Sequence, residues 1–203
     1  MKRSSKYDRI SDWVKKHKMT KRKGISLFHA KNYIKVTSLE EAYELNQKKS
    51  NAIIGGMLWL KMSNRNMQTA IDLSGLGLDK IEEQEDAFSI GCMCTLRQLE
   101  IHEALNRYFG GAMKACTRHI VGTQFRNGAT VGGSIFGRFG FSDILTCLLA
   151  LDTYVELYHA GVIALSEFVE MPRDNDILVR IIIKKDGRKI AYRSHREAAT
   201  DSR

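Results

Sequence analysis

Residues 121–143, VGTQFRNGATVGGSIFGRFGFSD, are the least ordinary stretch of this 203-residue chain and decide how the rest is interpreted. The stretch holds six glycines among 23 residues, interleaved with phenylalanine and arginine. That is too long for a simple turn, and loops of such length inside compact domains are usually functional. We therefore expect a functional loop here, which ends where Ser142 caps the apolar helix DILTCLLAL.

The segments around this loop mix helices and strands without strict alternation. Ser38 and Glu41 form a capping box ahead of the predicted helix LEEAYELNQKK, and further helices are predicted over 95–109 and 112–120. Strands are predicted at 52–54, 69–73, 87–93 and 153–159, and Asp186–Gly187 predicts a hairpin between DILVRIIIKK and KIAYRSH. This irregular order favours an α+β fold over a doubly wound sheet.

Two glycine pairs have the properties that diphosphate binding needs: Gly55–Gly56 after the first apolar strand, and Gly132–Gly133 within 130–135. Glycine lets phosphate oxygens approach backbone N–H groups, and it accepts positive φ. A side chain at Gly132 is thus expected to occupy phosphate space. A helical turn predicted at 57–61 would add unpaired donors. Each pair alone is more often a structural turn, and neither GxGxxG nor a Walker lysine occurs, so a dinucleotide would need a different architecture.

The positive charge is concentrated at the N-terminus. The formal net charge is +9, and residues 1–24 hold ten basic residues against two acidic ones, which leaves 22 basic and 21 acidic residues elsewhere. Such a leader is a candidate arm for nucleic acid or a membrane surface, but it is more often a solvated extension. We therefore expect a disordered leader and do not favour a nucleic-acid partner.

Neither the apolar runs nor the cysteines indicate a membrane or secreted protein. The longest apolar runs, 52–60 and 144–151, are far shorter than the roughly 20 residues of a spanning helix, and no apolar segment follows the basic N-terminus. Irregular spacing in apolar surroundings favours buried thiols over disulfides or metal ligands at Cys92, Cys94, Cys116 and Cys147. The sequence thus predicts a cytoplasmic protein without a metal site of its own.

The order of four segments carries a resemblance to a known family. NAIIGGMLWLKM, IGCMCTLRQLE, RHIVGTQFRNGATVGGSIFGRFGFSDILTCLLALDTYVELY and EFVEMPRDNDILVRIIIK resemble the FAD-binding subunit of xanthine dehydrogenase and related molybdenum hydroxylases, over about residues 31–200. The most specific part is RNGATVGGSI, followed eight residues after Ile135 by Asp143.

The resemblance implies a two-subdomain α+β FAD-binding fold of the molybdenum hydroxylase, vanillyl-alcohol-oxidase-like type. The expected organisation is a leader over 1–24, an FAD-binding domain over 25–175 with subdomains at about 30–85 and 86–172, and the start of a largely missing C-terminal α+β domain over 176–203. On this interpretation the apolar residues 177–183 would expose a sheet edge.

The resemblance also implies which residues hold FAD. Residues of the first glycine loop would wrap the pyrophosphate, those of the second would complete the grip, Asp143 would hydrogen-bond the hydroxyl-rich linker, Leu178 would pack beside a ring, and Arg193 would lie at the cofactor's edge. The implied set is Ile53, Ile54, Gly55, Gly56, Met57, Leu58, Trp59, Leu60, Thr130, Val131, Gly132, Gly133, Ser134, Asp143, Leu178 and Arg193. The plainer roles of Asp143 and Leu178, as a helix N-terminal acid and a core residue, stay open.

The chain departs from the family pattern at two places. Met57 stands where relatives often have glycine or a hydroxyl residue, and residues 136–141 are bulky where many relatives have small residues and a proline. Arg138 is expected to face either a phosphate or a partner subunit.

By this resemblance the chain is a cytoplasmic flavoprotein subunit of a xanthine-dehydrogenase-type oxidoreductase of purine metabolism. It would accept electrons from the 2Fe-2S clusters of an iron–sulfur subunit and pass them to NAD or another acceptor, while a separate molybdopterin-binding subunit hydroxylates the substrate. No residue is predicted to act as general acid or base, and His102, His119 and His159 are expected to be structural or surface residues. Three alternatives stay open: a truncated, non-functional flavin module; a nucleic-acid-binding protein acting through its leader; and a self-sufficient flavin oxidase, disfavoured because neither glycine loop holds His or Cys.

Overall fold

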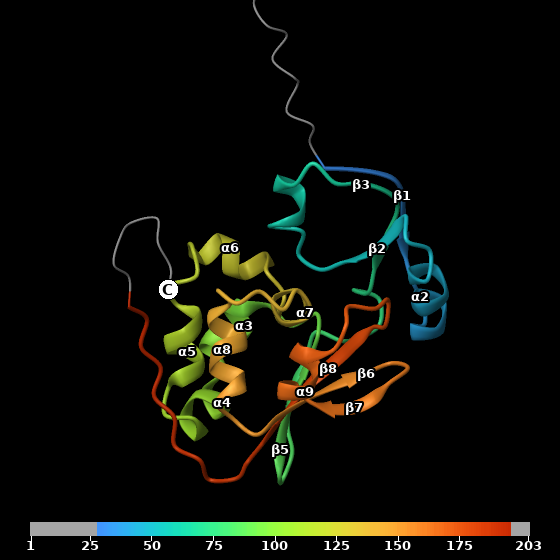
Figure 1. Ribbon diagram of the computed structural model, residues 1–203. Coiled ribbons are helices and arrows are strands. Elements are labelled where there is room, and N and C mark those ends of the chain that lie inside the picture. Colours follow the sequence, from blue (N-terminus) through green and yellow to red (C-terminus); the bar gives the residue numbers. More distant parts are fainter. Residues whose placement is uncertain (1–27, 196–203) are drawn as a thin grey trace, which may run out of the picture.

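The computed structural model describes residues 28–195, and the basic leader at 1–24 lies outside this range. The described chain begins with a three-stranded parallel sheet in the order β1-β3-β2, built from β1 (His29–Lys35), β2 (Asn51–Ile54) and β3 (Asn66–Asp72) (Figure 1). Helix α2 (Leu39–Asn46) connects β1 to β2, as the parallel arrangement requires.

Helix α2 begins where the sequence predicts it. The Ser38 hydroxyl accepts a hydrogen bond from Glu41 N at 3.1 Å, and the Glu41 carboxylate accepts one from Thr37 N at 2.8 Å. By contrast, the helical turn predicted at 57–61 is present only as the 3-10 turn η1 (Leu60–Met62). The reason is local, because Met57 has a φ of 61°, which no right-handed helix accommodates.

The second part of the fold is a five-stranded antiparallel sheet in the order β4-β5-β8-β6-β7. Its strands are β4 (Ile81–Glu83), β5 (Ala87–Gly91), β6 (Thr153–Leu157), β7 (Gly161–Ala164) and β8 (Leu178–Lys184). Figure 1 shows helices α3 to α8 gathered on one side of this sheet, while the short helix α9 (Leu165–Glu170) follows β7. A parallel unit joined to an antiparallel sheet with segregated helices is an α+β fold, as predicted.

The helix predicted over 95–109 is two helices, α3 (Leu96–Ile101) and α4 (Glu103–Tyr108). His102 between them has an extended conformation, and its ring nitrogen Nδ1 accepts a hydrogen bond from Leu105 N at 3.2 Å. Asn106 Nδ2 lies near the carbonyl oxygens that end α3, at 3.1 Å from Leu99 O and 3.0 Å from His102 O. The break is therefore supported by side-chain caps, which apolar periodicity does not reveal.

The glycine-rich stretch is not one long loop. It contains α6 (Thr123–Gly128), α7 (Val131–Phe136) and the start of α8 (Asp143–Leu149), and α5 (Ala112–Thr117) precedes it. Ser142 caps α8 as predicted, by accepting a hydrogen bond from Leu145 N. Glycine has low helix propensity, so the six-residue helices α6 and α7 depend on packing against the rest of the fold.

The hairpin predicted around Asp186–Gly187 is wrong. Strand β8 pairs with β5 on one edge and β6 on the other, so it is the central strand of the sheet and its apolar side chains are covered. Among residues 28–195 no strand follows it. The segment after β8 instead crosses the helices, where Gly187 N donates to the Tyr108 hydroxyl at 3.0 Å. A domain boundary at residue 176 stays a prediction.

One apolar core fills the space between the large sheet and the helices. Phe88, Leu99, Met113, Ile135 and Ile181 are each fully buried within it. A smaller cluster of Ile54, Met67 and Ala70 lies on the parallel sheet. None of the helices described between residues 28 and 195 is long and apolar enough to cross a membrane.

Candidate functional site: a cavity between two glycine stretches

Gly55 and Gly56 follow β2 and bring the first glycine stretch directly against the second. A Cβ on Gly55 would overlap Thr130 Oγ1, and a Cβ on Gly56 would overlap the carbonyl oxygen of Gly128. Neither glycine has a positive φ, so the expectation that this pair serves a left-handed turn is wrong. Glycine is needed at both positions because two backbones meet there without space for side chains.

The backbone that follows these glycines carries free hydrogen-bond donors. Within residues 28–195, no protein group accepts a hydrogen bond from the amide nitrogens of Gly55, Gly56, Met57 or Leu58. Successive unpaired N–H groups in a bend concentrate positive partial charge, and such concavities bind anions. The first glycine stretch therefore has the donors that a phosphate group requires.

The second glycine stretch begins helix α7. Thr130 Oγ1 caps the helix by accepting a hydrogen bond from Gly133 N at 3.3 Å. The two residues after Thr130 are bonded to the segment after β5, since Val131 N donates to Cys94 O and Gly132 N donates to Cys92 O, both at 2.8 Å. These bonds lock the position of α7 relative to the segment after β5.

Gly132 and Gly133 differ in what a side chain would meet. A Cβ on Gly132 would lie 2.6 Å from Cys92 O, so a side chain there would first collide with the protein. A Cβ on Gly133 meets only Thr130 Oγ1, at 3.1 Å, and Gly133 is exposed. The free space next to α7 therefore lies at Gly133, and the space expected at Gly132 is filled by the neighbouring chain.

Both glycine stretches line one cavity of about 450 Å³, a size typical of small-molecule sites. The cavity lies where the end of β2, the start of α7 and the start of β8 meet. It brings together seven of the predicted residues: Ile53, Ile54, Gly55, Thr130, Gly132, Gly133 and Leu178. It does not include the other predicted residues: Gly56, Met57, Leu58, Trp59, Leu60, Val131, Ser134, Asp143 and Arg193.

Sequence reasoning missed a large part of the lining. The missed residues come mainly from the loop before β8 and from α2 and β2: Arg173, Asp174, Asn175, Asp176, Ile177, Asn46, Asn51 and Ala52, together with Arg65, Leu73, Cys92 and Met93. Phe136, Gly137 and Phe139 also line the cavity, and they belong to the bulky segment 136–141 that the sequence singles out. The polar run RDND directly before a predicted strand was the one local signal for the loop. The contribution of α2 has no local signal, because it depends on how the two sheets meet.

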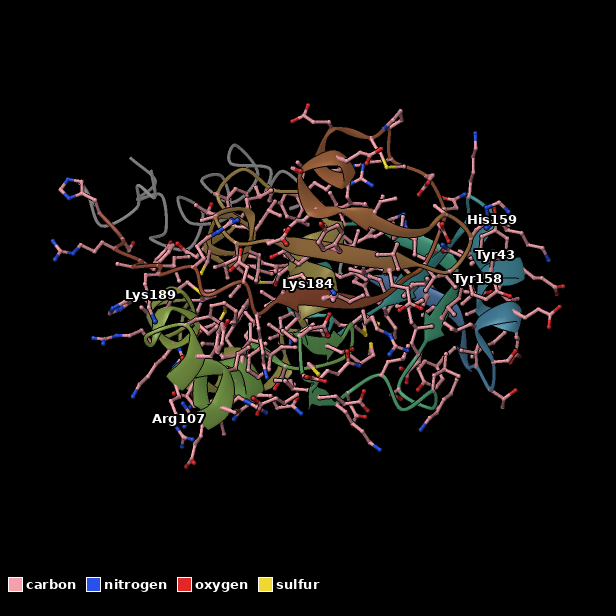
Figure 2. All side chains as sticks on the ribbon, turned by 90° about the horizontal axis from the view of Figure 1, so that it is seen from below. Tyr43, Arg107, Tyr158, His159, Lys184 and Lys189 are labelled. Atoms are coloured by element: carbon pink, nitrogen blue, oxygen red, sulfur yellow. The ribbon has the colours of Figure 1, made fainter. Side chains whose placement is uncertain are left out.

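At the polar end of the cavity, helix α2 contacts the loop before β8 and the turn between β6 and β7. Asn46 Nδ2, at the end of α2, donates to Asn175 O at 2.7 Å. Figure 2 shows Tyr43, Tyr158 and His159 gathered at the same junction, where the Tyr43 ring is stacked on His159 at 5.6 Å and lies 5.3 Å from Tyr158. These contacts join α2 to the β6–β7 turn and fix the width of the cavity there.

Asp176 is buried at this end and is already satisfied by the protein. Its carboxylate accepts hydrogen bonds from His159 N at 3.0 Å, Ala160 N at 2.9 Å and Ile177 N at 2.7 Å. Asp176 therefore orders the β6–β7 turn. It is not a free acceptor for a ligand.

Asn51, by contrast, leaves a buried acceptor unused. Its Nδ2 donates to Leu45 O at 2.8 Å, but its Oδ1 has no hydrogen-bond partner within residues 28–195. The residue is only 7% exposed and lines the cavity. A buried polar atom without a partner costs free energy, and a hydroxyl or amino group of a ligand would remove that cost.

Asp143 and Arg193 lie away from the cavity lining. Asp143 is the first residue of α8, and its carboxylate accepts a hydrogen bond from the Tyr192 hydroxyl. Burial and this hydrogen bond to Asp143 raise the pKa of Tyr192. Arg193, the next residue, is exposed.

Arg138 packs against α9, and its predicted role of facing a phosphate or a partner subunit stays a prediction. Its guanidinium lies 4.0 Å from the centroid of the Phe168 ring and donates to Met171 O. The φ of Arg138 is 48°, which turns the chain sharply after α7. The side chain thus anchors that turn against α9.

The cysteines near the cavity are not nucleophiles. Burial raises the pKa of the Cys92 and Cys94 thiols to about 12, so both are neutral at pH 7. All four cysteines are buried and free, as expected. In the part of the chain that the structure describes, no group of three or more His, Cys, Asp or Glu side chains could hold a metal ion.

A fold of this type, with two glycine stretches facing one cavity, defines a dinucleotide-binding module outside the Rossmann class. Comparison with known families agrees: residues 26–185 match the model of the FAD binding domain in molybdopterin dehydrogenase. Because the match covers more than half of the chain, the chain belongs to this family, whose cofactor is FAD.

Individual relatives are distant and longer than this chain. The uncharacterized protein YgfM of Escherichia coli strain K12 is 28% identical over 165 residues, which cover 79% of this chain and 62% of YgfM. Carbon monoxide dehydrogenase from Hydrogenophaga pseudoflava aligns with a TM-score of 0.73 at 18% identity, covering 86% of this chain and 66% of that one. Quinoline 2-oxidoreductase from Pseudomonas putida 86 aligns with a TM-score of 0.69 at 20% identity, covering 77% of this chain and 60% of that one. The structural likeness shows the fold, and the chain spans about three fifths of the curated relative's length.

Proposed function

We propose that this chain is the FAD-binding electron-transfer subunit of a molybdenum hydroxylase of the xanthine dehydrogenase type. The observation that carries the proposal is the convergence of Gly55, Thr130 and Gly133 on one cavity. Family membership supports the cofactor. The flavin supplies redox chemistry, and the protein supplies its placement and electrostatics.

The residues of the cavity fit the parts of FAD. The unpaired amides of Gly55 and Gly56, together with the free space at Gly133, would hold the diphosphate. The unused Oδ1 of Asn51 would accept a hydrogen bond from a hydroxyl or amino group. Leu178 would provide an apolar contact for a ring. Asp143 and Arg193 are retained as proposed contacts, although neither lines the cavity, and the same holds for Val131, Ser134 and residues 56–60.

The proposed partners follow from the same assignment. An iron–sulfur subunit would deliver electrons, a molybdopterin-binding subunit would oxidise the organic substrate, and NAD or another acceptor would receive the electrons. Two structural neighbours support a redox role, because one is a carbon monoxide dehydrogenase that lacks the Mo-pyranopterin moiety of its molybdenum cofactor and the other is a quinoline 2-oxidoreductase. The organic substrate and the electron acceptor of the complex are proposed in the same way as the partner subunits.

Replacing Gly133 with alanine tests the diphosphate site. The methyl group would enter the cavity next to the proposed diphosphate, while alanine in place of glycine favours the helix. We expect G133A to weaken FAD binding at least about tenfold, a loss of about 1.4 kcal/mol. The new Cβ lies 3.1 Å from Thr130 Oγ1, so urea unfolding of G133A checks that the chain still folds. Bound FAD is measured by visible absorbance and by titration of the full chain.

Gly140 provides the matched control, because it lies in the same glycine-rich stretch. A Cβ at Gly140 meets no atom within 4 Å, its φ is not positive, and it does not line the cavity. G140A should bind FAD like the wild type. Equal FAD affinity in G133A and G140A would contradict the placement of the diphosphate.

A further inference from the structure

The segment between α7 and α8 carries two exposed phenyl rings. Phe139 and Phe141 are 45% and 64% exposed, and their rings are stacked with centroids 5.2 Å apart and planes inclined by 16°. Single apolar side chains on a surface are ordinary, whereas aromatic side chains are common in the lining of ligand pockets. Only one ring of the pair, Phe139, lines the cavity.

The Phe139 ring is held in place by its neighbours. A Cβ on Gly137 would lie 2.5 Å from Phe139 Cε2, so the ring rests against the backbone at Gly137. Arg173 Nη2 donates to Gly137 O at 2.6 Å, and its guanidinium lies 5.9 Å from the centroid of the Phe139 ring. The ring is therefore positioned by the backbone, by Arg173 and by Phe141, although almost half of it is open to the cavity and solvent.

We propose that Phe139 is a positioning residue that stacks on one flat ring system of the bound dinucleotide. This inference rests on the proposed function, because FAD carries two such rings, the isoalloxazine and the adenine. Both have a π face, and an aromatic side chain at the edge of a cavity binds such a face without requiring particular hydrogen bonds. Phe141, on the far side of the pair, supports the ring and makes no contact with the ligand.

The test compares the same substitution at the two rings, in the full chain. F139L removes the aromatic face but keeps an apolar side chain, and F141L does the same at the ring that does not line the cavity. Stacking of one base on an aromatic ring corresponds to roughly 5- to 150-fold in affinity. We expect F139L to raise the Kd for FAD by about that factor and F141L to change it less than about twofold.

Two tryptophan variants identify the ring. In F139W an indole replaces the phenyl ring and preserves stacking, so FAD affinity should be retained, whereas F141W serves as the control. Contact with an indole quenches flavin emission by electron transfer. Lower emission of bound FAD in F139W than in F141W assigns the isoalloxazine to Phe139, and equal emission with retained affinity assigns the adenine.

The outcomes separate this inference from the proposed function. If the wild-type chain binds FAD but F139L and F141L bind it equally well, or are weakened equally, the stacking role is refuted and the cofactor assignment stands. If the wild-type chain does not bind FAD at all, alone or with its partner subunits, both the stacking role and the proposed function are refuted.

Discussion

Met57 holds a backbone conformation that glycine adopts more easily. Its φ of 61° lies in the left-handed region, which costs a non-glycine residue roughly 1 kcal/mol. The strain is located directly after Gly55 and Gly56, whose free amides form the proposed phosphate contact. The bend at Met57 is what keeps those amides from continuing into a helix.

Replacing Met57 tests this strain. M57G removes the strain and M57A retains it, while both remove the same contacts of the methionine side chain. We therefore expect M57G to be more stable than M57A by about 1 kcal/mol, although glycine is usually the less favourable residue. Urea unfolding of the two variants measures the difference. A more stable M57A would show that the backbone at this position is not left-handed.

The sequence revealed which glycines matter, but not why. The glycine pairs predicted two segments that meet in the fold, since Gly55, Gly132 and Gly133 line one cavity. One of the two expected reasons, positive φ, does not hold, because close packing against Thr130, Gly128 and Cys92 imposes glycine. The other reason, close approach of phosphate oxygens, stays a prediction. Contacts between residues so far apart in sequence leave no local pattern that could have shown this.

Among the elements, α3 and α6 are joined by a buried ion pair that supports the glycine stretches. Arg126 Nε lies 2.7 Å from Glu100 Oε2, and Arg126 Nη2 lies 3.2 Å from Glu100 Oε1. Glu100 and Arg126 are 6% and 5% exposed. Because α6 ends at Gly128, whose carbonyl contacts Gly56, this pair fixes the segment on which the first glycine stretch rests.

Breaking this pair should be costly. R126L leaves the Glu100 carboxylate buried without its main partner, so we expect a loss of about 3–5 kcal/mol in the free energy of unfolding. The double variant E100L/R126L removes both charges and should recover much of the loss. Chemical denaturation of the three proteins gives the values. A double variant less stable than R126L would refute this explanation.

Acid should weaken the same junction. Burial alone would raise the pKa of Glu100, but hydrogen bonds from Arg126 and Arg97 outweigh burial, and the pKa is lowered. A lowered pKa means that the stabilisation is fully present above the unfolded value of about 4.3 and is lost as the pH falls through the folded pKa.

E100Q removes this titration, so its stability should depend less on pH below about 4.3 than that of the wild type. Urea unfolding at a series of acidic pH values makes the comparison. Parallel pH profiles would show that Glu100 does not contribute to the acid sensitivity.

Element prediction succeeded where the signals are local and failed where they are not. The caps at Ser38 and Ser142 placed α2 and α8 correctly. The hairpin at Asp186–Gly187 failed because its first strand, β8, finds partners in β5 and β6, far away in sequence. Helices α6 and α7 were missed because glycine-rich residues form helices there only through tertiary contacts.

At the scale of the whole molecule, the cavity exists because two sheets are joined through α2 and the β6–β7 turn. A ligand that bridges these parts binds only the folded chain and should stabilise it. FAD at 100 times its Kd adds about 2.7 kcal/mol, which corresponds to a rise in Tm of roughly 5–11 °C for a chain of this size. Thermal unfolding with and without FAD measures the shift. A Tm that does not respond to saturating FAD would contradict binding at this junction.

The fold class and family could be predicted because the order of segments around RNGATVGGSI is specific. The architecture of the cavity could not, because it depends on long-range contacts such as Asn46 Nδ2 with Asn175 O. The loop before β8 is an example. Its polar residues predict only an ordinary turn, whereas the folded large sheet places them opposite α2.

The most direct test of the central claim is an NMR titration of the full chain with ADP, which carries the diphosphate without the flavin. We expect the largest amide shifts at Gly55, Gly56 and Gly133, the donors and the free space on the two sides of the cavity. The diphosphate placement would be contradicted if the glycine amides did not shift and the largest shifts lay at the opposite end of the molecule, near Arg107 and Lys189 in Figure 2.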